Sequence, residues 1–315
     1  MDKQLAMSDT VVPFQAGDGM ALNLIHVQGP RDATRGPVLV VHGAGVRANL
    51  FRPPVGTNFV EALLEHGYDV WLENWRASID LPPTEWTLDQ AALYDHPRAV
   101  QTILSQTGAA SVKAVIHCQG STSFMMAAVA GLLPAVKTVV SNAVSLHTRI
   151  PGTTRVAYDV TLPLIRRMVD YLDPHWGIEA PTTTAKLITA FVRATHWECD
   201  NTVCRLVSFT YGIGYPTLWS HANLNPATHD WIRHEFAKVP ISFFDQMFRC
   251  VSAGHLISVE GLPGLPADYT AQKPLTDARF AFVAGANNRC FLAEGQRESF
   301  EYFDHLQPGR HSIHI

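Results

Sequence analysis

The sequence lacks several features that would place it in a specialised class of protein. Its 315 residues carry 24 basic and 28 acidic side chains, for a net charge of −4, with no long run of either sign. Such a balance offers nothing that attracts a nucleic-acid backbone. No apolar run reaches the roughly 18 residues of a membrane span, and the opening MDKQLAMSDTVV lacks the pattern of a signal peptide. We therefore expect a cytoplasmic globular protein that binds small or neutral partners.

Cysteine is scarce, and the five residues are odd in number and scattered along the chain: Cys118, Cys199, Cys204, Cys250 and Cys290. This arrangement is typical of a reducing compartment rather than of a disulfide framework. Cys199 and Cys204 lie near His196 and suggest a metal, but no second ligand pair completes a zinc pattern. We expect structural thiols there, with no metal and no cofactor.

Strand-like and helix-like segments alternate in the first half of the chain. After a hairpin around Asp18-Gly19, continuous apolar runs of the kind found in buried parallel strands alternate with helical stretches. The expected strands cover 38–41, 68–72, 112–117 and 136–140, and the expected helices cover 58–66, 87–107 and 121–133. This pattern predicts an α/β fold, with a mostly parallel sheet and helices on both faces.

The alternation stops near Leu146 and returns near Lys273. The intervening sequence is aromatic, helical and interrupted by prolines, and FAFVAG at 280–285 then restores a strand. We therefore predict a first core segment over residues 1–145, an inserted helical cap over 146–273, and a second core segment over 274–315. Because the last segment stops inside a strand, we expect a core that is incomplete at its C-terminal end.

The stretch VIHCQGS at 115–121 has the form of a nucleophile elbow, in which a reactive side chain stands between a strand and a helix. Gly120 provides the small residue that such a turn needs two positions after Cys118, whereas Ile116 departs from the glycine expected two positions before it. Ser121 and Ser123 fall inside the predicted helix and are less well placed. Cys118 is therefore the candidate nucleophile, and the alternative is a packed thiol.

The position of Cys118 also suggests an activated thiol. Free N–H groups and the dipole at a helix N-terminus favour negative charge and can lower a cysteine pKa from about 8.5. Acyl transfer further needs N–H donors for the oxyanion, which here would be the backbone groups of Gln119 and of Ala44. Ala44 belongs to the loop that begins with His42-Gly43 directly after the first parallel strand.

These positions together resemble the α/β-hydrolase family over nearly the whole chain. GYDVWLENWR resembles acid-lipase-like members of that family. The motifs WRASIDLPP, WTLDQAALYDHPRAV, IHCQGS and GANNRCF resemble the hydrolase domain that is fused to, or encoded beside, cholesterol-oxidase-like flavin oxidoreductases. The resemblance covers about residues 38–315. It implies that a cysteine at the elbow is the subfamily's own pattern. Any flavin oxidoreductase that acts as a partner would be a separate chain, because no GxGxxG motif opens a strand-to-helix turn near the N-terminus.

The same resemblance leaves the rest of the catalytic triad incomplete. The acid of the family follows the strand that here reads FAFVAG, where Asn288 stands instead, and an amide can orient a histidine as in Cys-His-Asn enzymes. The alternative is a loop asparagine that stabilises its own turn. The base of the family follows the last strand, beyond the residues present here: the candidates His117, His305, His311 and His314 stand elsewhere. We expect either a chain truncated before its catalytic histidine or a degenerate member.

We therefore expect a hydrolase that acts on an apolar carboxylic ester, thioester or lactone through Cys118 and an acyl-enzyme. Two alternatives stay open. The first is an acyltransferase or polyester-synthase-like enzyme that uses the same cysteine. The second is a non-catalytic partner of a flavin oxidoreductase.

Overall fold

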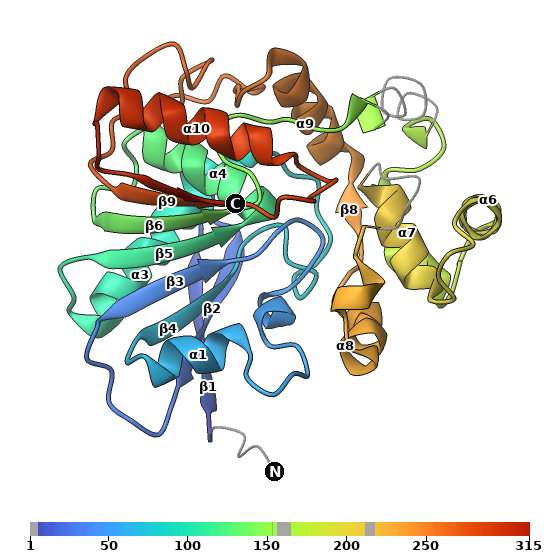
Figure 1. The fold of residues 1–315 in the computed structure, drawn as a ribbon, viewed down its shortest axis with the longest axis horizontal. Coiled ribbons are helices and arrows are strands. Elements are labelled where there is room, and N and C mark those ends of the chain that lie inside the picture. Colours follow the sequence, from blue (N-terminus) through green and yellow to red (C-terminus); the bar gives the residue numbers. More distant parts are fainter. Residues whose placement is uncertain (1–5, 153, 156–164, 212–217) are drawn as a thin grey trace.

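A single eight-stranded sheet forms the centre of the molecule (Figure 1). The computed structural model describes residues 6–152, 154–155, 165–211 and 218–315. The strand order is β1-β2-β4-β3-β5-β6-β9-β10. The strands are β1 (Ser8–Gln15), β2 (Ala21–Gln28), β3 (Pro37–Val41), β4 (Asp69–Asn74), β5 (Val112–His117), β6 (Val136–Asn142), β9 (Arg279–Val283) and β10 (Ser312–His314).

The sheet is parallel from β4 through β10, and β1 and β2 join it as an antiparallel hairpin. Gly19 occupies the hairpin turn with a φ of 87°, a conformation that glycine adopts without strain. All five residues of β3 are buried, as the continuous apolar run predicts for a strand covered on both faces. The expected mostly parallel α/β sheet is confirmed.

Helices cover both faces of this sheet, and alternate residues of β3 pack against the helices of opposite faces. Val38 and Val40 pack in a cluster with Val60 of α1 (Phe59–Glu65). Leu39 and Val41 belong to the larger cluster on the opposite face, which includes buried residues of several other helices. Among these helices are α3 (His96–Thr107), α4 (Cys118–Val129) and α10 (Ala293–Leu306).

The helix expected over 87–107 is present but contains an irregular turn. It begins as α2 (Leu88–Gln90), passes through a π-helical turn η2 (Ala91–Asp95), and continues as α3. The turn carries Asp95 into the core, where its carboxylate accepts bonds from Arg76 Nε at 2.9 Å and Nη2 at 2.6 Å. A π-helical turn of this kind re-aims one side chain without ending the helix.

The chain between β6 and β9 is mainly helical. It contains α6 (Thr183–Thr195), α7 (Thr202–Thr210), α8 (Pro226–Trp231) and α9 (Ile241–Ala253), with a two-stranded sheet of β7 (Tyr171–Leu172) and β8 (Val239–Pro240). Figure 1 shows α6, α7 and α8 grouped to one side of the main sheet. Short helical turns complete the description: η1 (Ala48–Phe51), η3 (Pro174–Gly177), η4 (His221–Asn223) and η5 (Ile232–His234). The division into core and cap at residues 146 and 273 stays a prediction.

Among the helices that the structure describes, none is both long and apolar enough to cross a bilayer.

Candidate active site

Cys118 lies at the sharp turn between β5 and α4. Its φ of 53° is left-handed, and only Ala143 among the other described non-glycine residues has a positive φ. An L-residue in this region is strained, and such strain is characteristic of functional turns. Ser121 and Ser123, the alternative nucleophiles, lie inside α4 and are fully buried. The turn therefore presents the Cys118 side chain and no serine.

Glycines allow the loop after β3 to approach this turn closely. A Cβ on Gly120 would collide with the backbone carbonyl oxygen of His42. A Cβ on Gly43 would lie 3.1 Å from Cys118 Cβ and 3.4 Å from its Sγ. The small residue expected two positions after Cys118 is thus required by contact with the His42-Gly43 loop.

The same loop contains Ala44, the second expected oxyanion donor. Its carbonyl oxygen accepts a 2.5 Å hydrogen bond from the Tyr211 hydroxyl. His42 supports the loop from inside: its Nδ1 is 2.6 Å from the Gly43 carbonyl oxygen, and burial lowers its pKa to about 3. His42 is therefore a neutral donor at physiological pH. The oxyanion role of the Ala44 and Gln119 N–H groups stays a prediction.

The expected lowering of the Cys118 pKa is wrong for the free protein. Burial raises this pKa to about 11, and a hydrogen bond from the Gln119 backbone N–H opposes the shift without cancelling it. The thiol is only partly exposed, and desolvation of the thiolate outweighs the helix N-terminus. Cys118 is consequently a neutral thiol at pH 7.

Alkylation with iodoacetamide tests this ionisation directly. Because only the thiolate reacts, we expect the rate at Cys118 to rise about tenfold per pH unit between about pH 7 and 10. Peptide mass spectrometry at each pH measures the rate at this site, and glutathione, with its ordinary thiol pKa, is the control. A rate at Cys118 that is already level below pH 8 would contradict the raised pKa.

Asn288 uses its side chain within its own loop. Its Oδ1 accepts hydrogen bonds from the backbone N–H groups of Cys290 at 2.9 Å and Phe291 at 3.2 Å. This geometry is that of an asparagine stabilising a turn, the alternative left open by the sequence. An orienting role toward a histidine stays a prediction.

None of the four sequence-suggested histidines forms a hydrogen bond to Cys118 in the part of the chain that the structure describes. His305 and His314 are exposed. His311 is buried, and its Nδ1 accepts the Phe280 N–H at 3.1 Å. His117 turns toward Phe51, which packs with the α1 side of the sheet, whereas Cys118 packs with the other side. The alternation of strand side chains correctly predicts this direction.

A buried Ser-His-Glu chain, which the sequence analysis missed, lies beneath the turn. His96 Nδ1 is 3.0 Å from Glu73 Oε1, and His96 Nε2 is 2.8 Å from Ser123 Oγ. Ser123 Oγ also donates to the Gln119 carbonyl oxygen at 3.2 Å. All three side chains are inaccessible, so the chain stabilises the start of α4 instead of meeting a substrate. Only the unusual burial of a glutamate and a histidine reveals it, and burial is a tertiary property.

A small apolar cavity lies beside Cys118. It measures about 30 Å³ and is lined by Gln119, Cys290 and mainly aromatic or aliphatic side chains, including Phe244, Met247 and Phe291. Burial and the nearby Cys118 raise the pKa of Cys290 well above its usual value, so this second thiol is neutral. The cavity supplies apolar surface and no fixed charge next to the elbow.

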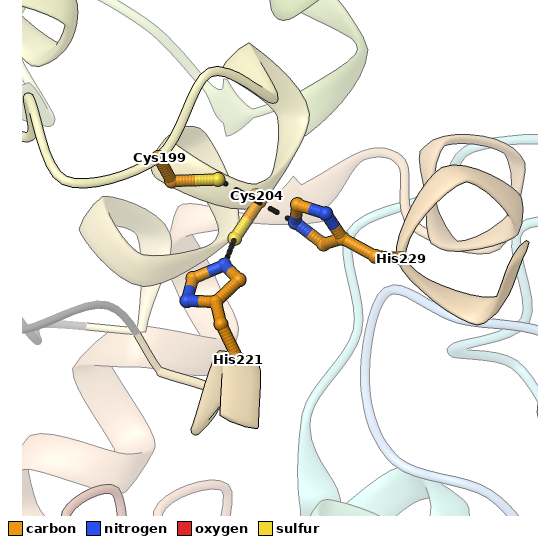
Figure 2. A group of neighbouring side chains, drawn as sticks. All are labelled: Cys199, Cys204, His221 and His229. Carbon is orange, nitrogen blue, oxygen red and sulfur yellow. Dashed lines mark hydrogen bonds between the residues drawn. The ribbon is translucent and has the colours of Figure 1, made fainter. Parts of the chain in front are cut away.

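Cys199 and Cys204, which the sequence suggests are structural thiols, form a side-chain cluster with two histidines other than His196. The ligand atoms of Cys199, Cys204, His221 and His229 all lie within 4.8 Å of one another (Figure 2). Sequence spacing does not reveal these histidines, because the seven residues between them exceed the usual zinc-finger range.

Comparison with known proteins agrees with this architecture. Residues 36–180 match the family model described as the alpha/beta hydrolase fold. Over 134 residues the chain is 27% identical to Sterol esterase 2 of Saccharomyces cerevisiae, and the match covers 37% of this chain and 25% of the esterase. The chain thus spans about a quarter of the length of that relative.

Solved structures share the fold at low sequence identity. The structure of DcsB in complex with a substrate analogue has a TM-score of 0.56 at 14% identity, and the alignment covers 97% of this chain and 88% of that one. A lipase-esterase related protein of Clostridium acetobutylicum has a TM-score of 0.52 at 12% identity, covering 93% and 89% of the two chains. A Pyrococcus furiosus esterase has a TM-score of 0.51 at 12% identity, covering 98% and 80%.

Proposed function

The chain has the α/β-hydrolase fold, and on that premise we propose that it hydrolyses an apolar carboxylic ester, thioester or lactone through Cys118. The observation that carries the proposal is the strained φ of 53° at Cys118, between β5 and α4. A turn of this form holds a nucleophile clear of the sheet, where it can reach a carbonyl carbon.

The neighbouring backbone supports acyl transfer at this sulfur. The Gln119 N–H already lies by the Cys118 sulfur, and Gly43 brings the Ala44 loop to the same turn. In the proposed reaction the Cys118 thiolate attacks the carbonyl carbon, the two N–H groups bind the oxyanion, and the alcohol or thiol leaves. Water then attacks the acyl-enzyme and returns the thiol.

The pKa of Cys118, raised to about 11, makes deprotonation of the thiol a required part of the first step. The neutral thiol must lose its proton before or during attack. With no imidazole hydrogen-bonded to the sulfur among the described residues, a base from solvent accepts this proton. Turnover of an activated ester by this chain should therefore increase with pH.

The cavity and the comparisons support an apolar substrate. Phe244, Met247 and Phe291 provide apolar contacts beside the nucleophile. The yeast relative is named a sterol esterase. We propose that the acyl or alcohol group packs against these side chains.

Trapping of the acyl-enzyme tests the proposal. We expect incubation with p-nitrophenyl acetate at about pH 9 to add one acetyl group, which peptide mass spectrometry places on Cys118. Prior alkylation of Cys118 should abolish the adduct. An acetyl group located only at other residues would overturn the proposal.

The same experiment distinguishes the two alternatives. An acyltransferase would pass the trapped acyl group to an added alcohol in preference to water, so release as the free acid alone excludes it. A non-catalytic partner of a flavin oxidoreductase would form no adduct that turns over. Appearance and decay of the adduct on Cys118 would therefore support hydrolysis.

A further inference from the structure

Four potential metal ligands meet in the helical region between β6 and β9, away from Cys118. Cys199 lies in the loop before α7 and Cys204 lies in the first turn of α7, whereas His221 begins η4 and His229 lies in α8. Both cysteines are buried and both histidines are half-buried. Figure 2 shows the two sulfurs and two imidazole rings turned toward a common centre.

The distances within this group fit a tetrahedral metal site. Zinc–sulfur bonds of about 2.3 Å and zinc–nitrogen bonds of about 2.0 to 2.1 Å, at tetrahedral angles, place sulfur and nitrogen roughly 3.5 Å apart. Here Cys199 Sγ is 3.4 Å from His229 Nε2, and Cys204 Sγ is 3.5 Å from His221 Nε2. The two imidazole rings stand at 86° with centroids 4.7 Å apart, so they approach the centre from different directions.

We propose that Cys199, Cys204, His221 and His229 bind one structural zinc ion. Two thiolates and two neutral imidazoles form a ligand set that zinc prefers, and two thiolates balance the charge of the ion. Four protein ligands fill a tetrahedral site and leave no position for substrate, so the metal has a structural role. Binding forms two Zn–S and two Zn–N bonds and releases the two thiol protons to solvent, without any redox change.

Hydrogen bonds around the ligands hold them in place. Asn201 Oδ1 accepts from the Cys204 backbone N–H at 3.2 Å, and Asn201 Nδ2 donates to the His229 carbonyl oxygen at 2.9 Å. Arg205 Nε donates to the Cys199 carbonyl oxygen. Such outer contacts orient ligands in metal sites. The two Asn201 bonds also connect the backbone at Cys204 in α7 to the backbone at His229 in α8.

The proposed zinc site would stabilise a helical region that contacts the loop next to Cys118. Cys199 and Cys204 pack in one apolar cluster with Val46, which follows the Ala44 loop. Tyr211, directly after α7, donates to the Ala44 carbonyl oxygen at 2.5 Å. A zinc ion would therefore join α7, η4 and α8 into one unit that contacts the loop predicted to hold the oxyanion. The proposal stands whether or not Cys118 is a nucleophile.

Metal analysis of the untagged chain tests this proposal. We expect about one zinc ion per chain by inductively coupled plasma mass spectrometry after dialysis against metal-free buffer. Cys204→Ser and His229→Asn should each lose most of this zinc, whereas Cys250→Ser and the exposed His234→Asn should keep it. Loss of zinc in the controls as well would mean another site or a general folding defect, and would overturn the assignment.

A second measurement on the unaltered protein avoids any dependence on variant folding. Titration with a mercurial reagent should release about one zinc ion as thiols react, and cobalt substitution should give the visible absorption of tetrahedral thiolate-bound Co²⁺. Chains that contain no zinc and take up no cobalt would overturn the proposal, as would a disulfide between Cys199 and Cys204.

Discussion

Replacing Cys118 with alanine should reduce turnover of p-nitrophenyl esters by at least about a thousandfold, because the acyl group then has no sulfur to which it can transfer. The fold should be retained. Alanine keeps the Cβ that contacts the Gly43 region, and the left-handed backbone costs a similar amount for both residues. Initial rates at about pH 9, with circular dichroism as the check on folding, provide the measurement.

Cys290 supplies the matched control for that variant. It is a second, partly exposed thiol that lines the apolar cavity, but it lies in the loop after β9 and not at a strand-helix turn. We expect Cys290→Ala to keep ester turnover within about threefold of the parent chain, since its thiol does not stand at the strained strand-helix turn. Equal losses in the two variants would argue against Cys118 as the nucleophile.

The largest loss of stability is expected on replacing Asp95 with alanine. Asp95 is fully buried, and its carboxylate binds the guanidinium of Arg76, which is 5% exposed. Arg76 would keep hydrogen bonds to the part-exposed Asp18 at 2.9 Å and to the Gln90 amide oxygen at 3.2 Å. Because the buried guanidinium loses its buried counter-charge, the free energy of unfolding should fall by about 3 to 5 kcal/mol. Urea unfolding followed by tryptophan fluorescence measures this change.

An exposed ion pair provides the comparison. Lys137 and Asp277 form a surface salt bridge at 3.0 Å, and both side chains are largely open to solvent. Exposed pairs contribute little to stability, so Asp277→Ala should leave the unfolding midpoint unchanged within error. If Asp95→Ala were equally harmless, the Arg76–Asp95 pair would not anchor the turn after β4.

Much of the fold could be predicted from local sequence patterns. The continuous apolar run of β3 and the turn glycine at 19 predict a buried strand and a hairpin because each depends on neighbouring residues. The sequence predicts the extent of the helix over 87–107 but not the π-helical turn within it. Its π-helical turn depends on Asp95 reaching Arg76, a residue 19 positions earlier that no local periodicity includes.

The candidate site likewise has features that local sequence predicts and others that it does not. The strand-turn-helix position of Cys118 and the need for a small residue at Gly120 follow from a seven-residue stretch. The pKa of that thiol does not follow from the stretch, and the sequence-based prediction of a lowered pKa was wrong. Whether the pKa rises or falls depends on how much apolar protein surrounds the sulfur. Cys290 and Phe291 contribute to these surroundings from a loop about 170 residues away.

Local sequence patterns are therefore enough to predict the α/β architecture and the place of Cys118 at the turn after β5, because hydrophobic periodicity and turn residues involve neighbouring positions. The partners of the side chains depend instead on the folded arrangement. It raised the pKa of Cys118, assigned Asn288 to its own loop, joined Glu73, His96 and Ser123 beneath the elbow, and brought His221 and His229 to the thiols of Cys199 and Cys204. Burial and distance between remote residues set these properties, and both exist only once the chain is folded.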